Sequence, residues 1–359
     1  MRAFAIVITA AILVSPGALV RAVALAAPTP CTTATTACER WVTLAGGPAR
    51  SLIYSTYSLD APNEAITRAL SMVHGADRNA DHYFATATAA GFLGGALGNT
   101  IIIAPRFAAG DDKVESNEVV WPSRGDSWRS GGMSPSNPAL SSFDFADEIL
   151  RKLGNKKNFP NLRGIVVTGH SAGGQFATRY EMSNKMHGTL PGVSITYVVA
   201  NPSSYAWPAA VRPLPTGDAD PATADKEALG DSAERVHTRF TYGLIDSTKV
   251  AGYDRWPAGL EDRAGYTAQM SDEQLKKQLI ERPTTYIWGQ VDVLPLGGFD
   301  SSPTAMAQGP TRRARGEAFF RYVTEALGAK HNAIIVPECG HNDRCMFTSE
   351  VVLPVIFPK

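Results

Sequence analysis

The chain has 359 residues, of which 44% are hydrophobic and 19% charged, a balance typical of a globular domain with a large core. Lysine plus arginine equals aspartate plus glutamate at 34 each, and no basic tract reaches five residues, which argues against a nucleic-acid partner. Because α/β chains of this length often form one domain, we expect a single folded domain over residues 41–359.

The N-terminus has the three-part pattern of a secretory signal peptide. Arg2 precedes an apolar run at residues 4–14, and small residues fill positions 24–27. We expect residues 1–26 to be removed by cleavage after Ala26, which makes the mature protein secreted or periplasmic. The apolar run is too short to span about 30 Å of hydrocarbon, so no stable membrane insertion is expected.

Four cysteines follow the expected cleavage site: Cys31, Cys38, Cys339 and Cys345. An even number in an exported protein indicates two disulfides, for which three pairings are possible. We expect the local pairs, Cys31 with Cys38 and Cys339 with Cys345, because they close the shortest loops. A zinc site is the alternative, but no CxxC pair or His-rich segment favours it, and we expect no metal and no cofactor.

After a Thr-rich linker expected over residues 27–40, short apolar runs alternate with helical stretches. A strand pair is predicted within residues 41–59, where Gly46-Gly47-Pro48 interrupts the alternating pattern. Further strands are predicted at 69–73, 100–104, 164–168, 195–200, 284–288 and 333–336, with helices at 81–91, 143–153, 175–185 and 317–327.

Continuous Val/Ile runs that alternate with helices predict an α/β fold with a mostly parallel sheet and helices on both faces. Residues 202–278 break that rhythm and are rich in Pro, Asp and Trp. We interpret them as an insertion that could cap a site.

The clearest chemical motif is Gly169-His170-Ser171-Ala172-Gly173, which fits G-x-S-x-G. The β-branched run before it and the helical stretch after it predict a sharp strand-to-helix turn that exposes Ser171. A hydroxyl held in this way can attack a carbonyl if a base lies beside it, so Ser171 is the candidate nucleophile. A glycine-rich turn that contains a serine by chance is the alternative.

Two backbone donors are expected to bind the oxyanion that such an attack creates. The N–H of Ala172 begins the helix after the nucleophile, where the helix dipole also favours negative charge. A second donor should follow the third core strand, where His74-Gly75-Ala76 offers the N–H of Gly75 or of Ala76. An ordinary strand-exit turn is the alternative for this segment.

The general base should follow the last core strand, and His341 lies there. His331 precedes that strand and should lie at the opposite end of the sheet. His170 is expected to face away from the nucleophile across the turn, and His74 belongs to the oxyanion loop. A disulfide between Cys339 and Cys345 would close the loop that carries His341 into a small ring and hold the base in place.

The acid that orients the base should follow the preceding strand. Asp292 lies just beyond the strand predicted at 284–288, after Gly289, and is the first candidate. Asp246 and then Asp300 are the alternatives.

Several blocks resemble one branch of the α/β-hydrolases and together cover most of residues 70–348: VHGADRNADHYF, IIIAPRF, VVTGHSAGGQFATRY, VVANPSSYAW, YIWGQVDV and CGHNDRCMF. That branch is similar to polyhydroxyalkanoate depolymerases and to bacterial oxidised polyvinyl alcohol hydrolases. The latter are exported enzymes of about this length that cleave β-diketone carbon–carbon bonds in an oxidised polymer.

The resemblance implies the α/β-hydrolase fold, a triad of Ser171, His341 and Asp292, and Trp256 as a wall of the substrate pocket. Tyr205, Trp207 and Tyr253 in the insertion are further candidates to line a groove for polymer chains, although packing of the insertion explains them equally well. The expected partner is a small-molecule or polymeric carbonyl substrate. A secreted carboxylesterase or polyester depolymerase is the alternative activity, and a non-catalytic binding protein on the same fold is the alternative of another class.

Overall fold

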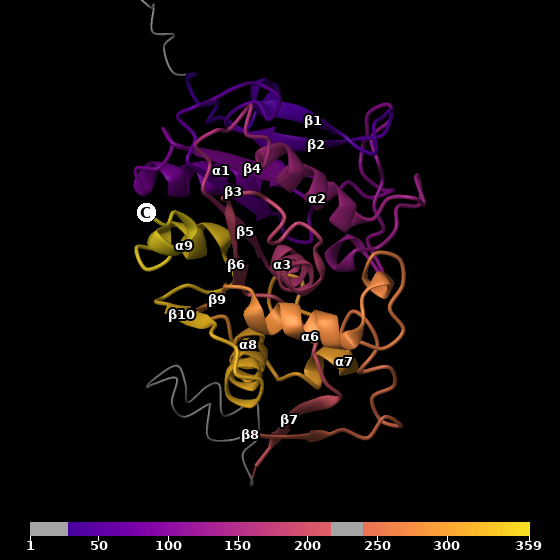
Figure 1. The fold of residues 1–359 in the computed structure, drawn as a ribbon. Coiled ribbons are helices and arrows are strands. Elements are labelled where there is room, and N and C mark those ends of the chain that lie inside the picture. The colour runs from indigo at the N-terminus through magenta and orange to yellow at the C-terminus, as the bar shows by residue number, and fades with distance from the viewer. Residues whose placement is uncertain (1–27, 217–239) are drawn as a thin grey trace, which may run out of the picture.

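The computed structural model describes residues 28–216 and 240–359. Its strands form an eight-stranded central sheet and a two-stranded sheet, which lie apart from each other in Figure 1. The signal peptide expected over residues 1–26 lies outside the described residues. The central strands are β1 Glu39–Thr43, β2 Arg50–Ser55, β3 Arg68–Val73, β4 Thr100–Pro105, β5 Gly164–His170, β6 Ser194–Ala200, β9 Thr284–Gly289 and β10 Asn332–Val336. The small sheet pairs β7 Val211–Pro215 with β8 Phe240–Leu244.

The strands of the central sheet follow the spatial order β1-β2-β4-β3-β5-β6-β9-β10. The pairs β1·β2 and β2·β4 are antiparallel, and every later pair is parallel. Parallel strands place their carboxyl ends at one edge, where the loops after β3, β5, β9 and β10 all emerge. The predicted fold class, a mostly parallel α/β sheet, is confirmed.

The two faces of the sheet carry two separate apolar cores, as the period-2 alternation of strand side chains requires. In β4, Ile101 and Ile103 enter one core and Ile102 enters the other. Because both faces are covered, the central strands consist of continuous apolar runs.

Helices cover both faces of the sheet, with α1 and α9 on one side and α2, α3 and α6 on the other (Figure 1). The α-helices are α1 Ala80–Leu93, α2 Ser142–Leu153, α3 Ala172–Ser183, α6 Asp272–Glu281, α7 Pro303–Met306, α8 Arg312–Arg321, α9 Asp343–Thr348 and α10 Leu353–Ile356. Short 3-10 turns lie at Thr36–Cys38, Trp128–Ser130 and Thr267–Gln269, and a π-helical turn at Tyr322–Ala326 continues α8.

Several element boundaries differ from the sequence prediction, and three of the differences have a clear physical cause. Strand β1 begins at Glu39, inside the segment expected to be a linker, because it pairs with β2 along its whole length. Helix α8 begins at Arg312 rather than at residue 317, since the Thr311 hydroxyl caps it by accepting the N–H of Ala314. Helix α6 falls inside the range expected to be an insertion, yet its buried Leu275 and Leu279 belong to the main core.

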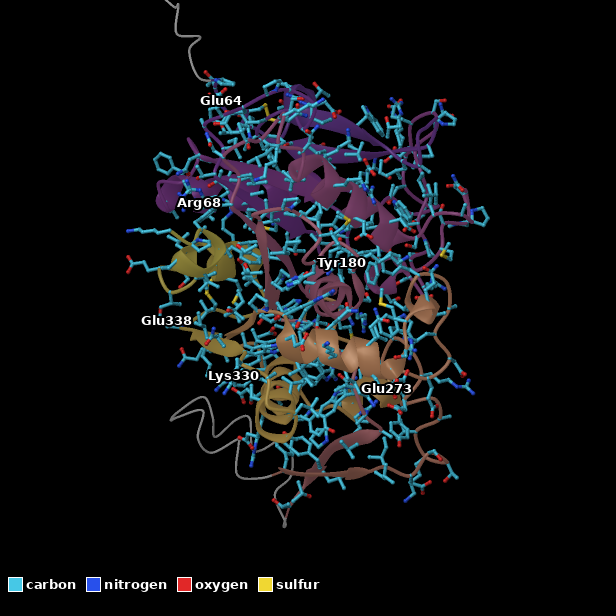
Figure 2. The ribbon with its side chains drawn as sticks, viewed as in Figure 1. Glu64, Arg68, Tyr180, Glu273, Lys330 and Glu338 are labelled. Carbon is cyan, nitrogen blue, oxygen red and sulfur yellow. A yellow bond between two sulfur atoms is a disulfide. The ribbon has the colours of Figure 1, made fainter. Side chains whose placement is uncertain are left out.

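One buried carboxylate joins the segment at 202–278 to the helices of the core. Asp147 on α2 accepts hydrogen bonds from the hydroxyls of Tyr180 at 2.6 Å and Tyr266 at 2.7 Å. Figure 2 shows Tyr180 in the interior at α3, whereas Tyr266 precedes α6. Burial raises the pKa of Asp147 to about 6. Each oxygen of the Asp147 carboxylate therefore accepts a hydrogen bond from a tyrosine of a different, distant segment of the chain.

Among the described residues, no helix combines the length and the apolar character needed to cross a membrane.

Candidate active site

Ser171 stands alone between the end of β5 at His170 and the start of α3 at Ala172. Its backbone has φ 58° and ψ −116°, a conformation that a residue with a side chain rarely adopts. The N–H of Ser171 donates to the carbonyl of Ala200 on β6 at 3.0 Å, which ties the strained turn to the neighbouring strand. The G-x-S-x-G motif thus forms the sharp turn that the sequence predicts.

Close backbone contacts explain the glycines of the motif. A Cβ on Gly173 would lie 2.2 Å from the carbonyl oxygen of Val73, and one on Gly174 would lie 2.4 Å from that of Ala200. A Cβ on Gly169 would lie 2.4 Å from the carbonyl oxygen of Gly173. Only glycine therefore lets α3 start this close to β3 and β6.

The hydroxyl of Ser171 meets the ring of His341 at the carboxyl edge of the sheet. Ser171 Oγ lies 2.9 Å from His341 Nε2, and His341 Nδ1 lies 2.9 Å from Asp292 Oδ2. Since the carboxylate can only accept, Nδ1 carries the proton and Nε2 is free to accept from the serine. The three side chains form a continuous relay from residues that are far apart in the sequence.

Each member of the relay follows a different parallel strand. Ser171 follows β5, Asp292 follows β9, and His341 follows β10. The Asp292 side chain is 1% exposed and that of His341 9%, so the relay is closed to bulk water over most of its surface. The two alternative acids have other surroundings: Asp246 binds Thr248 in an exposed turn, and Asp300 borders a cavity that Arg179 and Trp256 also line.

A buried arginine without a sequence signature, Arg312, pairs with the Asp292 carboxylate at the oxygen that does not bind His341. The guanidinium of Arg312 is fully buried, with Nη1 3.4 Å from Asp292 Oδ1 and Nε 3.0 Å from Ser203 Oγ. Its Nη2 donates to the carbonyls of Leu296 and Gly297 in the loop that follows Asp292. Burial lowers the pKa of Arg312. No local sequence pattern distinguishes Arg312 from the other arginines of its helix.

His170 does not face away from the site as expected. Its ring packs against His341 with the centroids 4.5 Å apart. Asn201 Nδ2 lies 3.4 Å from His170 Nε2, and Tyr83 Oη lies 3.2 Å from His170 Nδ1. Because the amide nitrogen of Asn201 donates, His170 accepts at Nε2 and carries its proton at Nδ1, which donates to Tyr83. Burial lowers the pKa of His170 well below its ordinary value, so this ring is neutral.

The loop after β3 lies beside the turn at Ser171, and two of its N–H groups differ in their partners. The N–H of Gly75 is directed to the hydroxyl of Tyr83, whereas that of Ala76 makes no hydrogen bond to any described residue. His74 holds the loop in place, since its Nε2 accepts the N–H of Phe107 at 3.0 Å. Burial lowers the pKa of His74 to about 4, which keeps it neutral. The N–H of Ala172 begins α3 without an intrahelical partner.

A disulfide encloses the loop that carries His341. Cys339 and Cys345 are bonded, six residues apart, on either side of it. Cys31 and Cys38 form a second bond, seven residues apart, at the edge of the sheet.

Two of the four aromatic residues predicted to line a groove lie in the core instead. Tyr205 and Trp207 are both 0% exposed, because they stack around Phe319 of α8. Tyr253 packs under the guanidinium of Arg212, and Trp256 borders a cavity of about 230 Å³. The aromatic residues that follow β6 therefore fill the space under α8 rather than a groove.

In the described ranges 28–216 and 240–359, no group of three or more His, Cys, Asp or Glu side chains is arranged to hold a metal ion.

A sharp serine turn, a histidine after the last strand and an acid after the strand before it, all on a mostly parallel sheet, define an α/β-hydrolase architecture. The chain belongs to the alpha/beta hydrolase family, whose model matches residues 72–352.

Solved structures of polymer-degrading enzymes share this fold. The poly(3-hydroxybutyrate) depolymerase LpqC from Bordetella parapertussis is 18% identical with a TM-score of 0.58, and the match covers 86% of this chain and 84% of that one. Poly(aspartic acid) hydrolase-1 from Sphingomonas sp. KT-1 is 20% identical with a TM-score of 0.57, and the match covers 89% of this chain and 98% of that one. No curated protein matches the chain with significant sequence similarity.

Proposed function

We propose that the protein is an exported serine hydrolase that cleaves carbonyl substrates through an acyl-enzyme. The observation that carries this proposal is the relay in which Ser171 Oγ and Asp292 Oδ2 each lie 2.9 Å from a different nitrogen of His341. A non-catalytic protein on this fold has no need of a strained serine within hydrogen-bond distance of an imidazole.

The reaction follows from the positions of the donors and acceptors. Ser171 Oγ attacks the carbonyl carbon while its proton passes to His341 Nε2, and Asp292 stabilises the cationic ring that results. The oxyanion takes hydrogen bonds from the N–H of Ala172 and from that of Ala76, since the N–H of Gly75 is directed to Tyr83. The leaving group departs with a proton from His341, and water then hydrolyses the acyl-enzyme by the same steps.

The first candidate substrate is a β-diketone in an oxidised polymer, as the sequence blocks that resemble oxidised polyvinyl alcohol hydrolases suggest. Attack on one carbonyl breaks the bond to the central carbon, which leaves as an enolate and takes up a proton to give a methyl ketone. The acyl-enzyme then releases a carboxylic acid. The second candidate is a polyester, a proposal that the structural likeness to a poly(3-hydroxybutyrate) depolymerase supports.

The class of reaction is tested with a fluorophosphonate probe, which labels an activated serine. The wild-type protein should be labelled, and Ser171→Ala should fold normally without taking up label. Labelling of Ser171→Ala at the wild-type rate would refute the assignment of the nucleophile.

The bond that is cleaved is tested by comparing a 2,4-dione with p-nitrophenyl acetate as substrates. Conversion of the dione to a methyl ketone and a carboxylate by the wild-type protein supports the first candidate. Turnover of the ester alone would exclude it in favour of the second. In both assays Asp292→Asn should reduce kcat by about 10⁴-fold, because the imidazole then loses the correct tautomer.

Export is proposed from the signal-peptide pattern at residues 1–26 together with the two disulfides. N-terminal sequencing of protein recovered from the periplasm or the medium should begin at Ala27. Recovery of a chain that retains residues 1–26 would contradict the proposal.

A further inference from the structure

A cavity of about 230 Å³ lies beside α3, and we name it the Arg179 cavity after its buried guanidinium. Arg179, Ser204, Trp256 and Asp300 are among the residues that line it. The family resemblance implies that Trp256 forms a wall of the substrate pocket, whereas no sequence pattern indicates a role for Arg179.

Within residues 28–216 and 240–359, Arg179 has no carboxylate partner, although it is only 2% exposed. Its Nε donates to the carbonyl of Pro257 at 3.0 Å, and its Nη2 donates to Ser204 Oγ at 3.1 Å. Neither acceptor is charged, and Nη1 donates to none of the described residues. Burial, with a smaller effect from Arg129, lowers the pKa of Arg179 to about 9. A buried guanidinium without an anion is unfavourable, so its position beside a cavity points to a ligand that supplies the anion.

The charges around the Arg179 cavity favour an anionic ligand. The carboxylate of Asp300 attracts four arginine side chains electrostatically: those of Arg129, Arg179, Arg312 and Arg315. Asp300 itself accepts only the N–H of Ser302 among the described residues.

The other two acids nearby do not remove the excess of positive charge. Asp292 is engaged by Arg312 and His341. Asp126 accepts a hydrogen bond from the hydroxyl of Ser130 at 2.8 Å, and burial raises its pKa. Four guanidinium groups therefore face at most three carboxylates, which leaves the region positive.

The cavity lies within reach of the nucleophile. Ser171, Gln175 and Arg179 recur at four-residue intervals and so share one face of α3. Gln175 Nε2 donates to Ser204 Oγ, the same oxygen that accepts from Arg179. Eight residues of helix span about 12 Å, and helical side chains lean toward the N-terminus, which shortens the path from Arg179 to Ser171.

The loop after Asp292 connects the cavity to the base along a second route. A Cβ on Gly297 would lie 3.1 Å from Cδ2 of His341. Asp300, three residues later, borders the cavity. Three residues of extended chain span at most about 11 Å, so the cavity and the imidazole are near neighbours.

We infer that the Arg179 cavity is a subsite for a carboxylate that the substrate carries several bonds away from the carbonyl attacked by Ser171. This inference rests on the proposed function. Hydrolysis of either an ester or a β-diketone releases a carboxylic acid, so each cut gives one fragment that ends in the group that the cavity accepts. The other fragment ends in an alcohol or a methyl ketone. The enzyme then prefers acid-ended oligomers to neutral chains.

The test compares each acid-ended substrate with its neutral methyl ester. One series carries the carboxylate on the acyl side, as mono-4-nitrophenyl esters of dicarboxylic acids from succinate to sebacate. The other carries it on the alcohol side, as butyrate esters of ω-hydroxy acids of matched length. For the wild-type enzyme, kcat/KM should favour the acid-ended member over the neutral one at one chain length in at least one series.

Arg179→Gln should lower that charged-to-neutral ratio by about tenfold or more, mainly through KM, because a charge-assisted hydrogen bond is lost. Arg179→Lys keeps the charge without the planar fork and should restore part of the ratio. Arg255→Gln is the matched control, since Arg255 borders the same cavity but is exposed and paired with Asp262. It should retain the wild-type ratio.

A wild-type ratio of one in both series would overturn the inference, and so would a preference that survives in Arg179→Gln. If Arg179→Gln does not fold, inhibition of the wild-type enzyme replaces it. Free suberate should then compete with the neutral ester, and the uncharged diamide should not; equal inhibition by both would overturn the inference. Failure of the proposed function is distinct, because the wild-type enzyme would then leave the neutral esters intact as well.

Discussion

The imidazole of His170 packs against that of His341 with ring centroids 4.5 Å apart and 38° between the planes. A second histidine so close to a base would oppose the positive charge that the base must accept if both could be protonated. His170 avoids this conflict, because burial lowers its pKa well below the ordinary value. Its contribution is a neutral surface that limits the rotation of His341.

We predict that the acid limb of the pH profile of kcat/KM shows a single protonation between about pH 5 and pH 8, because His170 remains neutral throughout. His170→Ala removes the packing surface and should reduce kcat by about 10- to 100-fold with little change in KM. Steady-state kinetics across this pH range measures both effects. A wild-type limb with a slope of two would show that His170 also titrates.

Arg312 should be required for the acid to function. Arg312→Met leaves the buried Asp292 without its guanidinium and should reduce stability by about 3 to 5 kcal/mol, with a loss of kcat of about 100-fold. Arg315→Met is the control, since Arg315 lies nearby on α8 and is equally buried but bonds Ser203 and Gly309 rather than Asp292. It should lose comparable stability in denaturant unfolding and keep more of its kcat. Equal losses of kcat would contradict a specific role for Arg312.

Removal of either disulfide should lower stability by a similar amount, but only one of the two removals should lower activity. Their loops are nearly equal, so replacing either pair by serines should lower the free energy of unfolding by roughly 2 kcal/mol. Only the Cys339→Ser/Cys345→Ser protein should also lose kcat, because that bond encloses His341. The Cys31→Ser/Cys38→Ser protein should keep its kcat below its unfolding temperature. Unchanged kcat in the first protein would show that the disulfide only protects the loop.

The glycines of the nucleophile turn should tolerate no side chain. Gly173→Ala places a Cβ 2.2 Å from the carbonyl oxygen of Val73, so we expect an insoluble or inactive protein. Gly98→Ala is the control, because open space surrounds that position, and it should leave activity unchanged while altering stability by less than about 1 kcal/mol. Soluble expression and p-nitrophenyl ester turnover measure the contrast. Full activity of Gly173→Ala would refute the proposed backbone contact.

Stability should fall with rising pH because of Glu181. This side chain is fully buried, and burial raises its pKa from 4.5 to about 8. The folded state holds the proton that the unfolded state loses, so the stabilisation is complete below pH 4.5 and declines as the pH rises to about 8. Glu181→Gln should therefore be more stable than the wild-type protein at pH 8 by roughly 2 to 4 kcal/mol, with a much smaller difference at pH 5.

Denaturant unfolding at the two pH values tests this prediction, with Glu281→Gln as an exposed control that should show no such pH dependence. An equal stability difference for Glu181→Gln at pH 5 and pH 8 would contradict it.

Much of the fold could be predicted because it depends on local patterns. Buried parallel strands such as β4 and β5 are continuous Val/Ile runs. The glycines of the G-x-S-x-G motif occur where a Cβ would clash with neighbouring backbone. The order of serine, acid and histidine along the chain predicted Ser171, Asp292 and His341, and the structure brings these three side chains together. These features are visible in sequence because each depends on neighbouring residues.

Contacts between distant segments were harder to predict. Nothing near Arg312 indicates that it reaches Asp292, and nothing near His170 indicates whether its ring turns toward or away from His341. Tyr205 and Trp207 suit a groove as well as a core by composition, and only the packing of α8 over β9 decides between them. The start of α8 was predicted five residues late, because its first turn carries buried arginines rather than apolar residues.

The paired phenols on Asp147 limit how segments can be exchanged between relatives of this protein. Tyr266 belongs to the segment at 202–278, whereas Tyr180 and Asp147 belong to helices α3 and α2. A transplanted segment 202–278 without a hydroxyl at position 266 would leave one oxygen of the buried Asp147 carboxylate without its hydrogen bond, next to the helix that follows Ser171. Chimeras designed to alter substrate range should therefore transfer this tyrosine together with the segment, or replace Asp147 at the same time.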